Sequence, residues 1–122
     1  EGLIHDYKVN KMKTGQYINY DCYILELIGK KKTLSYPKRV IWVDKKTFVL
    51  VKMDLYALSG IKLKTMTLDK IKKVGKKYIP TWMKMSDALN KTAYTEMNLE
   101  NIQLDSDLSD SVFSKQNLRY GQ

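Results

Sequence analysis

The side chains that could act as nucleophiles or general bases are few, and they do not form a catalytic set. The only histidine, His5, lies beside Asp6 near the start of the sequence, where a solvated His-Asp pair is more common than a general base. The only cysteine, Cys22, lies in an apolar segment, so we expect a buried thiol that acts as a small hydrophobic side chain. The sequence has no phosphate-binding loop, dinucleotide-binding glycine motif, Gly-x-Ser-x-Gly turn or Cys-x-x-Cys pair. It therefore predicts a protein that is not an enzyme.

Metal and cofactor chemistry have as little support. Asp105, Asp107 and Asp110 faintly resemble calcium ligands, but they lack the spacing, the glycine and the final glutamate of an EF-hand loop. We expect a polar turn there, and neither a metal site nor a cofactor.

Burial of an apolar ligand has better candidates. Five of the six methionines fall in four successive strand-like segments of the second half, and two tryptophans accompany the pattern. Methionine is unbranched and polarisable, which suits a surface that holds acyl chains, although an ordinary core with several methionines would read the same way. Alternation along the strands cannot place the whole set on one face, so some members belong to the core. The candidate lining residues are Trp42, Met53, Met66, Trp82, Met83, Met85 and Met97.

The charge is strongly positive and unevenly placed. The net charge of the chain is +9; residues 1–91 hold 20 basic against 8 acidic residues, a balance of +12, and residues 92–122 hold 2 against 5, a balance of −3. Such a surface attracts nucleic acid, anionic lipid or an acidic protein. Only Arg39 and Arg119 are arginines, and the lysines cluster at expected turns, so no nucleic-acid partner is expected.

The elements that must position these side chains are almost all strands. Short polar segments separate seven β-rich runs, and Asp44–Thr47 is expected to turn one hairpin while Gly60 turns another. The predicted strands are Tyr7–Lys13, Tyr20–Ile28, Tyr36–Val43, Phe48–Tyr56, Ile61–Lys73, Lys77–Met85 and Thr92–Leu104.

Several of these strands are apolar on both faces, which decides the fold class. A sheet of this kind must close on itself or curl around something apolar, because its edges and second face otherwise stay exposed. We therefore expect a mainly β protein, a curved antiparallel sheet or incomplete half β-barrel of about seven strands. One short helical turn is expected near the C-terminus, over Ser111–Phe113 and Asn117–Leu118. No linker or repeat divides residues 1–122, which we expect to form one domain.

The order of the motifs resembles the bacterial outer-membrane lipoprotein-sorting proteins, the family related to the periplasmic lipoprotein carriers. The likeness covers nearly the whole chain, and the order and spacing of the motifs make it specific. The segments that carry it are Asp6-Tyr7, Tyr20–Leu27, Tyr36–Lys45, Met53–Tyr56, Ser59–Lys64, Ile79–Met85, Lys91-Thr92, and Val112–Ser114 with Leu118.

The resemblance implies a half-barrel whose concave side holds acyl chains, and an exported protein of the periplasm or outer membrane. It implies a lipid or lipoprotein acyl chain as ligand, and membrane-associated donor and acceptor proteins as partners. The family's covering helices and first strands precede the matched region, so this chain is expected to be the C-terminal portion of a longer domain. Exposed strand edges would then pair copies into a homo-oligomer. The alternatives are a basic β-module that binds a polyanion or nucleic acid, and a structural envelope domain that docks on a partner protein.

Overall fold

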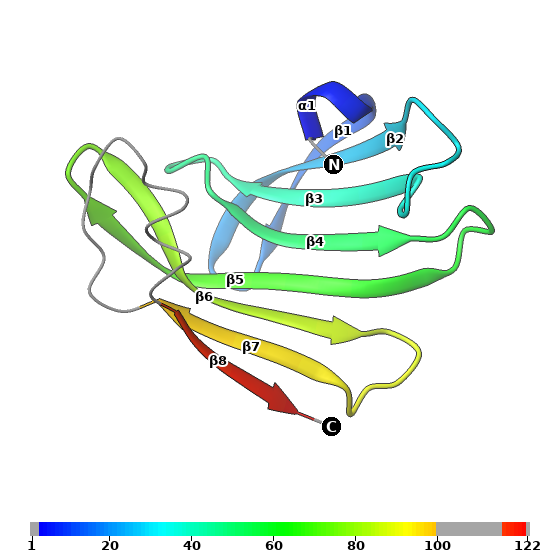
Figure 1. Ribbon diagram of the computed structural model, residues 1–122. Helices are drawn as coiled ribbons and strands as arrows, with labels where there is room; N and C mark the ends of the chain where they lie inside the picture. The colour runs from blue at the N-terminus through cyan, green and yellow to red at the C-terminus, as the bar shows by residue number, and fades with distance from the viewer. Residues whose placement is uncertain (1–2, 100–115, 122) are drawn as a thin grey trace.

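A single eight-stranded antiparallel sheet makes up nearly all of the structure (Figure 1). The computed structural model describes residues 3–99 and 116–121. The strands neighbour one another in chain order, from β1 at one edge to β8 at the other, after one four-residue helix. The elements are α1 (Leu3–Asp6), β1 (Tyr7–Tyr17), β2 (Tyr20–Gly29), β3 (Lys38–Asp44), β4 (Leu50–Tyr56), β5 (Lys62–Val74), β6 (Lys77–Asp87), β7 (Tyr94–Leu99) and β8 (Gln116–Gly121).

All seven predicted strands are present, but the predicted helical turn is wrong where it is described. Asn117 and Leu118 lie in β8, opposite Asn98 and Met97 of β7. Pairing with β7 supplies backbone partners to this short segment, whereas a single helical turn would leave most of its N–H and C=O groups unpaired. Residues 111–113, the end of the last predicted strand at 100–104, and the three aspartates at 105, 107 and 110 lie outside the described residues.

The β3–β4 hairpin turns where the sequence predicts, and Asp44 holds it. The Asp44 carboxylate accepts hydrogen bonds from the Thr47 backbone N–H (3.1 Å) and hydroxyl (2.6 Å), and the Phe48 N–H donates to the Asp44 carbonyl (2.8 Å). Gly60 turns the β4–β5 hairpin with φ +91°, a conformation that glycine adopts without a steric penalty.

The sheet is open and strongly curved, which confirms the incomplete barrel. Within residues 3–99 and 116–121, β1 and β8 do not pair with each other. The Tyr20 hydroxyl of β2 donates to the Asp69 carboxylate of β5 over 2.5 Å, although β3 and β4 separate the two strands in the sheet order. Figure 1 shows why: the β1–β2 hairpin swings behind the other strands. Register shifts at Asn10 and Val51 add local twist.

The core lies on one face of the first four strands. Tyr7, Leu27, Ile41, Met53 and Leu55 form the buried cluster. The β2–β3 loop packs Leu34 and Tyr36 against it, and the Tyr7 hydroxyl donates to the Tyr36 carbonyl over 2.5 Å. None of the helices in the described part of the chain has the length and apolarity to cross a membrane.

Candidate functional site

The strand register brings all six methionines to one face of the sheet. Residues directly opposite each other in an antiparallel pair project from the same face. One row of opposed residues runs across six strands, through Met12, Leu25, Ile41, Met53, Met66 and Met85. The next row joins Leu68, Met83 and Met97. We call this surface the methionine face, defined by Met12, Met53, Met66, Met83, Met85 and Met97.

Exposure differs among the residues of the methionine face. Met53 is 6% exposed and belongs to the core, and Met66 and Met85 pack against that core while staying half-buried. Met83 and Met97 are also half-buried, and Met12 is 66% exposed. The apolar core therefore continues into a surface of methionines that solvent partly reaches.

Both tryptophans lie on the opposite face, so the predicted set divides into five methionines and two tryptophans. Trp42 is paired with Lys52, whose Nζ lies 4.4 Å from the centre of the indole. Trp82 is paired with Asn98, and its Nε1–H donates to Glu96 Oε1 over 3.0 Å. Each tryptophan thus interacts with a charged side chain, and neither lies on the face that carries the methionines.

Charged and polar side chains dominate that opposite face. Asp54, 3% exposed, accepts from the Thr65 hydroxyl (2.9 Å) and lies 3.5 Å from Lys62 Nζ. The hydrogen bond from Asn10 holds the pKa of Glu26 below its usual value, although partial burial opposes it.

Tyr20 is the most perturbed acid on this face. Burial, reinforced by the hydrogen bond to Asp69, raises the pKa of Tyr20 to about 12. A neutral tyrosine therefore holds β2 against β5 up to high pH. The opposite face is thus internally paired and builds the curvature, while the methionine face is free of such pairing groups over Met66, Met83 and Met97.

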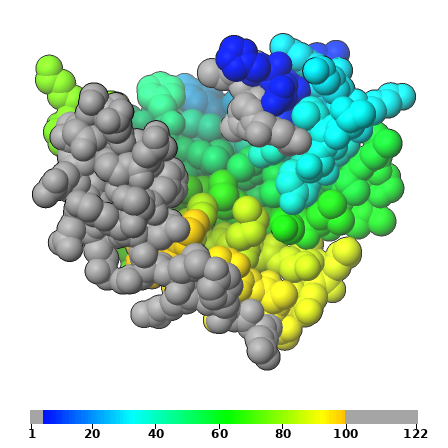
Figure 2. All heavy atoms as spheres, in the orientation of Figure 1, coloured from blue at the N-terminus to red at the C-terminus, as the bar shows by residue number. Residues whose placement is uncertain are grey.

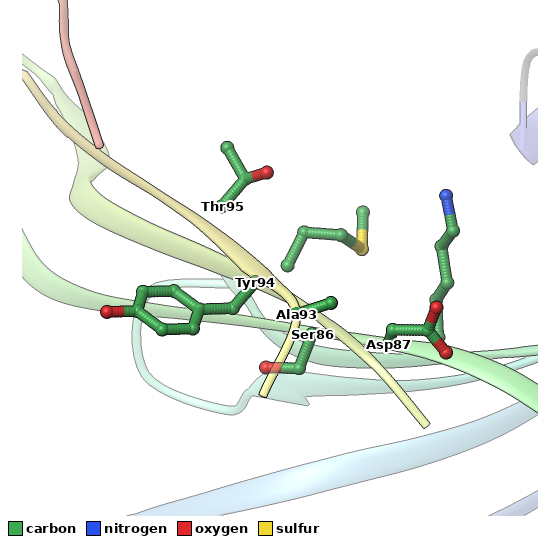
Figure 3. A pocket seen from close by; sticks show the side chains of 7 residues that line it. Ser86, Asp87, Ala93, Tyr94 and Thr95 are labelled. Atoms are coloured by element: carbon green, nitrogen blue, oxygen red, sulfur yellow. The ribbon is translucent and has the colours of Figure 1, made fainter. Parts of the chain in front are cut away.

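A pocket of about 310 Å³ lies at the end of the methionine face, beside the β6–β7 turn (Figure 3). Lys64 and Asp87 oppose each other across β5 and β6 at its rim, next to Met85. Figure 3 shows Thr95 and Tyr94 leaving β7 on opposite sides of the strand, Thr95 on the methionine face and Tyr94 on the other, and both line the pocket. The pocket thus combines two apolar side chains, Met85 and Ala93, with three hydroxyl groups, one cation and one anion. Its lining residues are Lys64, Met85, Ser86, Asp87, Ala93, Tyr94 and Thr95.

Metal-ligating side chains do not cluster in the described ranges. No group of three histidine, cysteine or acidic residues there could hold a metal ion. His5 is exposed, and Cys22 is fully buried, with burial raising the pKa of its thiol above the ordinary value.

Met12 is the residue that sequence reasoning missed. It lies in an edge strand, and the register shift at Asn10 changes which face the following residues occupy. No sequence signal marks a bulge of this kind, so its position on the methionine face follows only from the pairing with Leu25.

Comparison with known proteins gives one matching family model and three similar crystal structures. A family model with the description "Uncharacterized protein" matches residues 1–120. Three crystal structures are similar to the chain. A LolA superfamily protein from Nitrosomonas europaea is 30% identical over 72% of the chain, with a TM-score of 0.64. A domain from Vibrio parahaemolyticus described as an outer membrane lipoprotein-sorting protein is 26% identical over 96%, with a TM-score of 0.73. A DUF1329 family protein from Desulfovibrio piger is 28% identical over 88%, with a TM-score of 0.71.

The open antiparallel sheet is thus similar in fold to structures named for the LolA superfamily and for outer membrane lipoprotein sorting. The chain belongs to the family whose model matches residues 1–120, and its structural neighbours are a LolA superfamily protein, an outer membrane lipoprotein-sorting domain and a DUF1329 family protein. It spans 40%, 43% and 44% of the lengths of the three similar structures. Among curated proteins, none matches the chain.

Proposed function

We propose that the methionine face binds the acyl chains of a lipid or a lipoprotein, and that the protein carries them without chemical change. One observation carries this proposal: all six methionines share a face, and Met66, Met83, Met85 and Met97 on it are half-buried. A surface with this exposure is too apolar to be left to water without cost and too flexible in shape to select one rigid ligand.

Removal of methylene groups from water would supply the affinity. Each buried methylene contributes about 0.8 kcal/mol, so shortening a bound acyl chain by two methylenes should weaken binding by about 15-fold. The acyl chain would lie across Met66 and Met85, and its polar end would reach the pocket, where Lys64 can neutralise a phosphate or carboxylate. The lining we propose is thus Met53, Met66, Met83, Met85 and Met97, with Met12 at its edge.

We propose the bacterial envelope as the place of action, with export to the periplasm or the outer membrane. The names of the Nitrosomonas and Vibrio structures support this, since they refer to the LolA superfamily and to outer membrane lipoprotein sorting. Membrane-associated proteins would donate and accept the ligand. That residues 1–122 form a single β domain, and that copies pair through exposed strand edges, stay predictions.

The experiment first identifies any lipid bound to the protein and then measures the affinity for fatty acids of increasing chain length. The folded protein, purified from a bacterial envelope fraction without detergent, is extracted with organic solvent, and the extract is analysed by mass spectrometry. A fluorescent fatty acid is then displaced by saturated fatty acids of increasing length. Bound lipid together with affinity that rises steeply with chain length supports the proposal. An empty protein whose affinity is flat across the series would overturn it.

A further inference from the structure

The densest run of lysines in the sequence lies on one hairpin. Five lysines fall within residues 70–77, and all five are exposed. None of them forms an ion pair with another residue of the described ranges. The five are Lys70, Lys72, Lys73, Lys76 and Lys77, and we call residues 69–79 the basic arm. Like charges held this close repel one another, so an anionic partner would relieve the repulsion.

The basic arm extends beyond the rest of the sheet. Thr67 of β5 opposes Lys52 of β4. Only two residues of β4, back to its first residue Leu50, lie beyond this pair, whereas β5 continues for seven residues, to Val74. The strand bends at Lys70, which has φ +53°, and Thr81 holds the bend through a 2.7 Å hydrogen bond from its hydroxyl to the Lys70 carbonyl. In Figure 1 the arm leaves the body of the sheet at the left, and in Figure 2 its tip projects clear of the molecule.

Two bulky apolar residues stand at the turns that share this end of the sheet. Phe48, in the β3–β4 turn, is 72% exposed, and Ile18, in the β1–β2 turn, is 68% exposed. Both have positive φ, +58° and +54°, a conformation that costs energy for residues with large or β-branched side chains. Backbone strain that presents an apolar side chain to solvent is typical of a functional contact.

Phe48 is held rigidly in this position. The Asp44 hydrogen bonds fix the turn, and the Phe48 ring stacks on Tyr23 with a centroid distance of 6.4 Å. Lys45 Nζ lies 5.4 Å from the same Tyr23 ring and 3.5 Å from Asp21. The turn therefore presents an aromatic ring at its tip with lysine beside it, and little conformational entropy remains to be lost on binding.

We propose that this end of the sheet docks on the surface of an anionic phospholipid bilayer. Phe48 and Ile18 would enter the headgroup region, and the basic arm would contact lipid phosphates. Residues 69–79 stay strongly positive, because Asp69 is their one acid against five lysines, and the nearby Asp21 pairs with Lys45. A nucleic acid is the less fitting partner, because the apolar residues protrude singly instead of forming a stacking groove, and the arm has no arginine. This surface shares no residue with the methionine face, so the inference goes beyond acyl binding.

The test is co-sedimentation with vesicles, using the intact chain. Vesicles of phosphatidylcholine are compared with an equal mixture of phosphatidylcholine and phosphatidylglycerol. Each lysine near an anionic surface is worth about fivefold in affinity, so K72Q/K73Q/K76Q/K77Q should bind the mixed vesicles more than about 100-fold more weakly at low salt. F48N should bind the mixed vesicles about tenfold more weakly, because one large apolar side chain no longer enters the interface.

Matched controls come from the opposite end of the sheet. Leu58 and Leu89 are 69% and 71% exposed there, and Lys30, Lys31 and Lys32 form a second lysine cluster. L58N/L89N and K30Q/K31Q/K32Q should keep most of the vesicle affinity.

Equal losses in these controls, or wild-type binding that does not depend on phosphatidylglycerol, would refute the docking surface. Tighter binding to single-stranded DNA than to mixed vesicles, undiminished in F48N, would assign the arm to nucleic acid instead. All of these variants should displace a fluorescent fatty acid like the wild type. The fatty-acid assay therefore tests acyl binding, and the vesicle assay tests membrane docking, independently of each other.

Discussion

The double variant M83Q/M97Q separates acyl binding from folding. Met83 and Met97 oppose each other across β6 and β7, both half-buried, and neither belongs to the core cluster. Glutamine has nearly the length and flexibility of methionine, and its amide can reach water while the face is free. A bound acyl chain would cover both amides and leave them without partners.

The expected size follows from that desolvation. Burying an unpaired amide costs about 1 kcal/mol at the low end of the measured range, which suits side chains that are only partly covered. Two such groups should weaken binding by about 2 kcal/mol, or about 30-fold. The free energy of unfolding in urea should change by less than about 1 kcal/mol, because the free protein keeps both amides hydrated.

The assay is displacement of a fluorescent fatty acid, with W82F as the matched control. Trp82 adjoins Met83 in the chain but lies on the opposite face, where it donates to Glu96. W82F should therefore bind acyl chains like the wild type. Unchanged affinity in M83Q/M97Q, or an equal loss in W82F, would refute the assignment of the methionine face.

Three further predictions concern the fold. Stability to urea should be full below pH 10 and should fall as pH rises from 10 towards 12, because Tyr20 stays protonated in the folded protein while it ionises in the unfolded chain; Y20F should lack that part of the decline, and an identical decline in both proteins would contradict the role of the Tyr20–Asp69 bond. Cys22 should resist alkylation in the folded protein and react in urea, since its thiol is fully buried with a raised pKa; rapid labelling without denaturant would show that β2 opens. F48N should raise the free energy of unfolding by up to about 1 kcal/mol, because asparagine tolerates positive φ better than phenylalanine; a clear loss of stability would mean that the Phe48–Tyr23 stacking outweighs the backbone strain.

The fold was largely predictable because its signals are local. Alternating β-rich runs and the polar turn after Asp44 mark the strands and hairpins directly, and a two-sided apolar pattern indicates a curved sheet. The C-terminal segment was misassigned because Asn117-Leu118 has no strand pattern of its own and pairs with β7 through its backbone. Long-range pairing, which no short window of sequence contains, decides such a segment.

The site was only half predictable for a related reason. Alternation within one strand can be read from the sequence, so Met83 and Met85 were certain to share a face. The relation between strands depends on register, and the bulges at Asn10 and Val51 shift it by one residue each. Register is what joins Met12 to the set and places Trp42 on the other face, whereas alternation with Met83 already separates Trp82 from the methionines.

The most direct measurement is nuclear magnetic resonance of the methionine methyl groups with a spin-labelled fatty acid. The chain has six methionines on one face and two tryptophan indoles on the other, so each face carries its own reporters. Binding of the spin-labelled acyl chain should broaden the methyl signals of Met66, Met83, Met85 and Met97 and leave both indole N–H signals sharp. Broadened indole signals with sharp methyl signals, or no broadening on either face at saturating ligand, would contradict an acyl site on the methionine face.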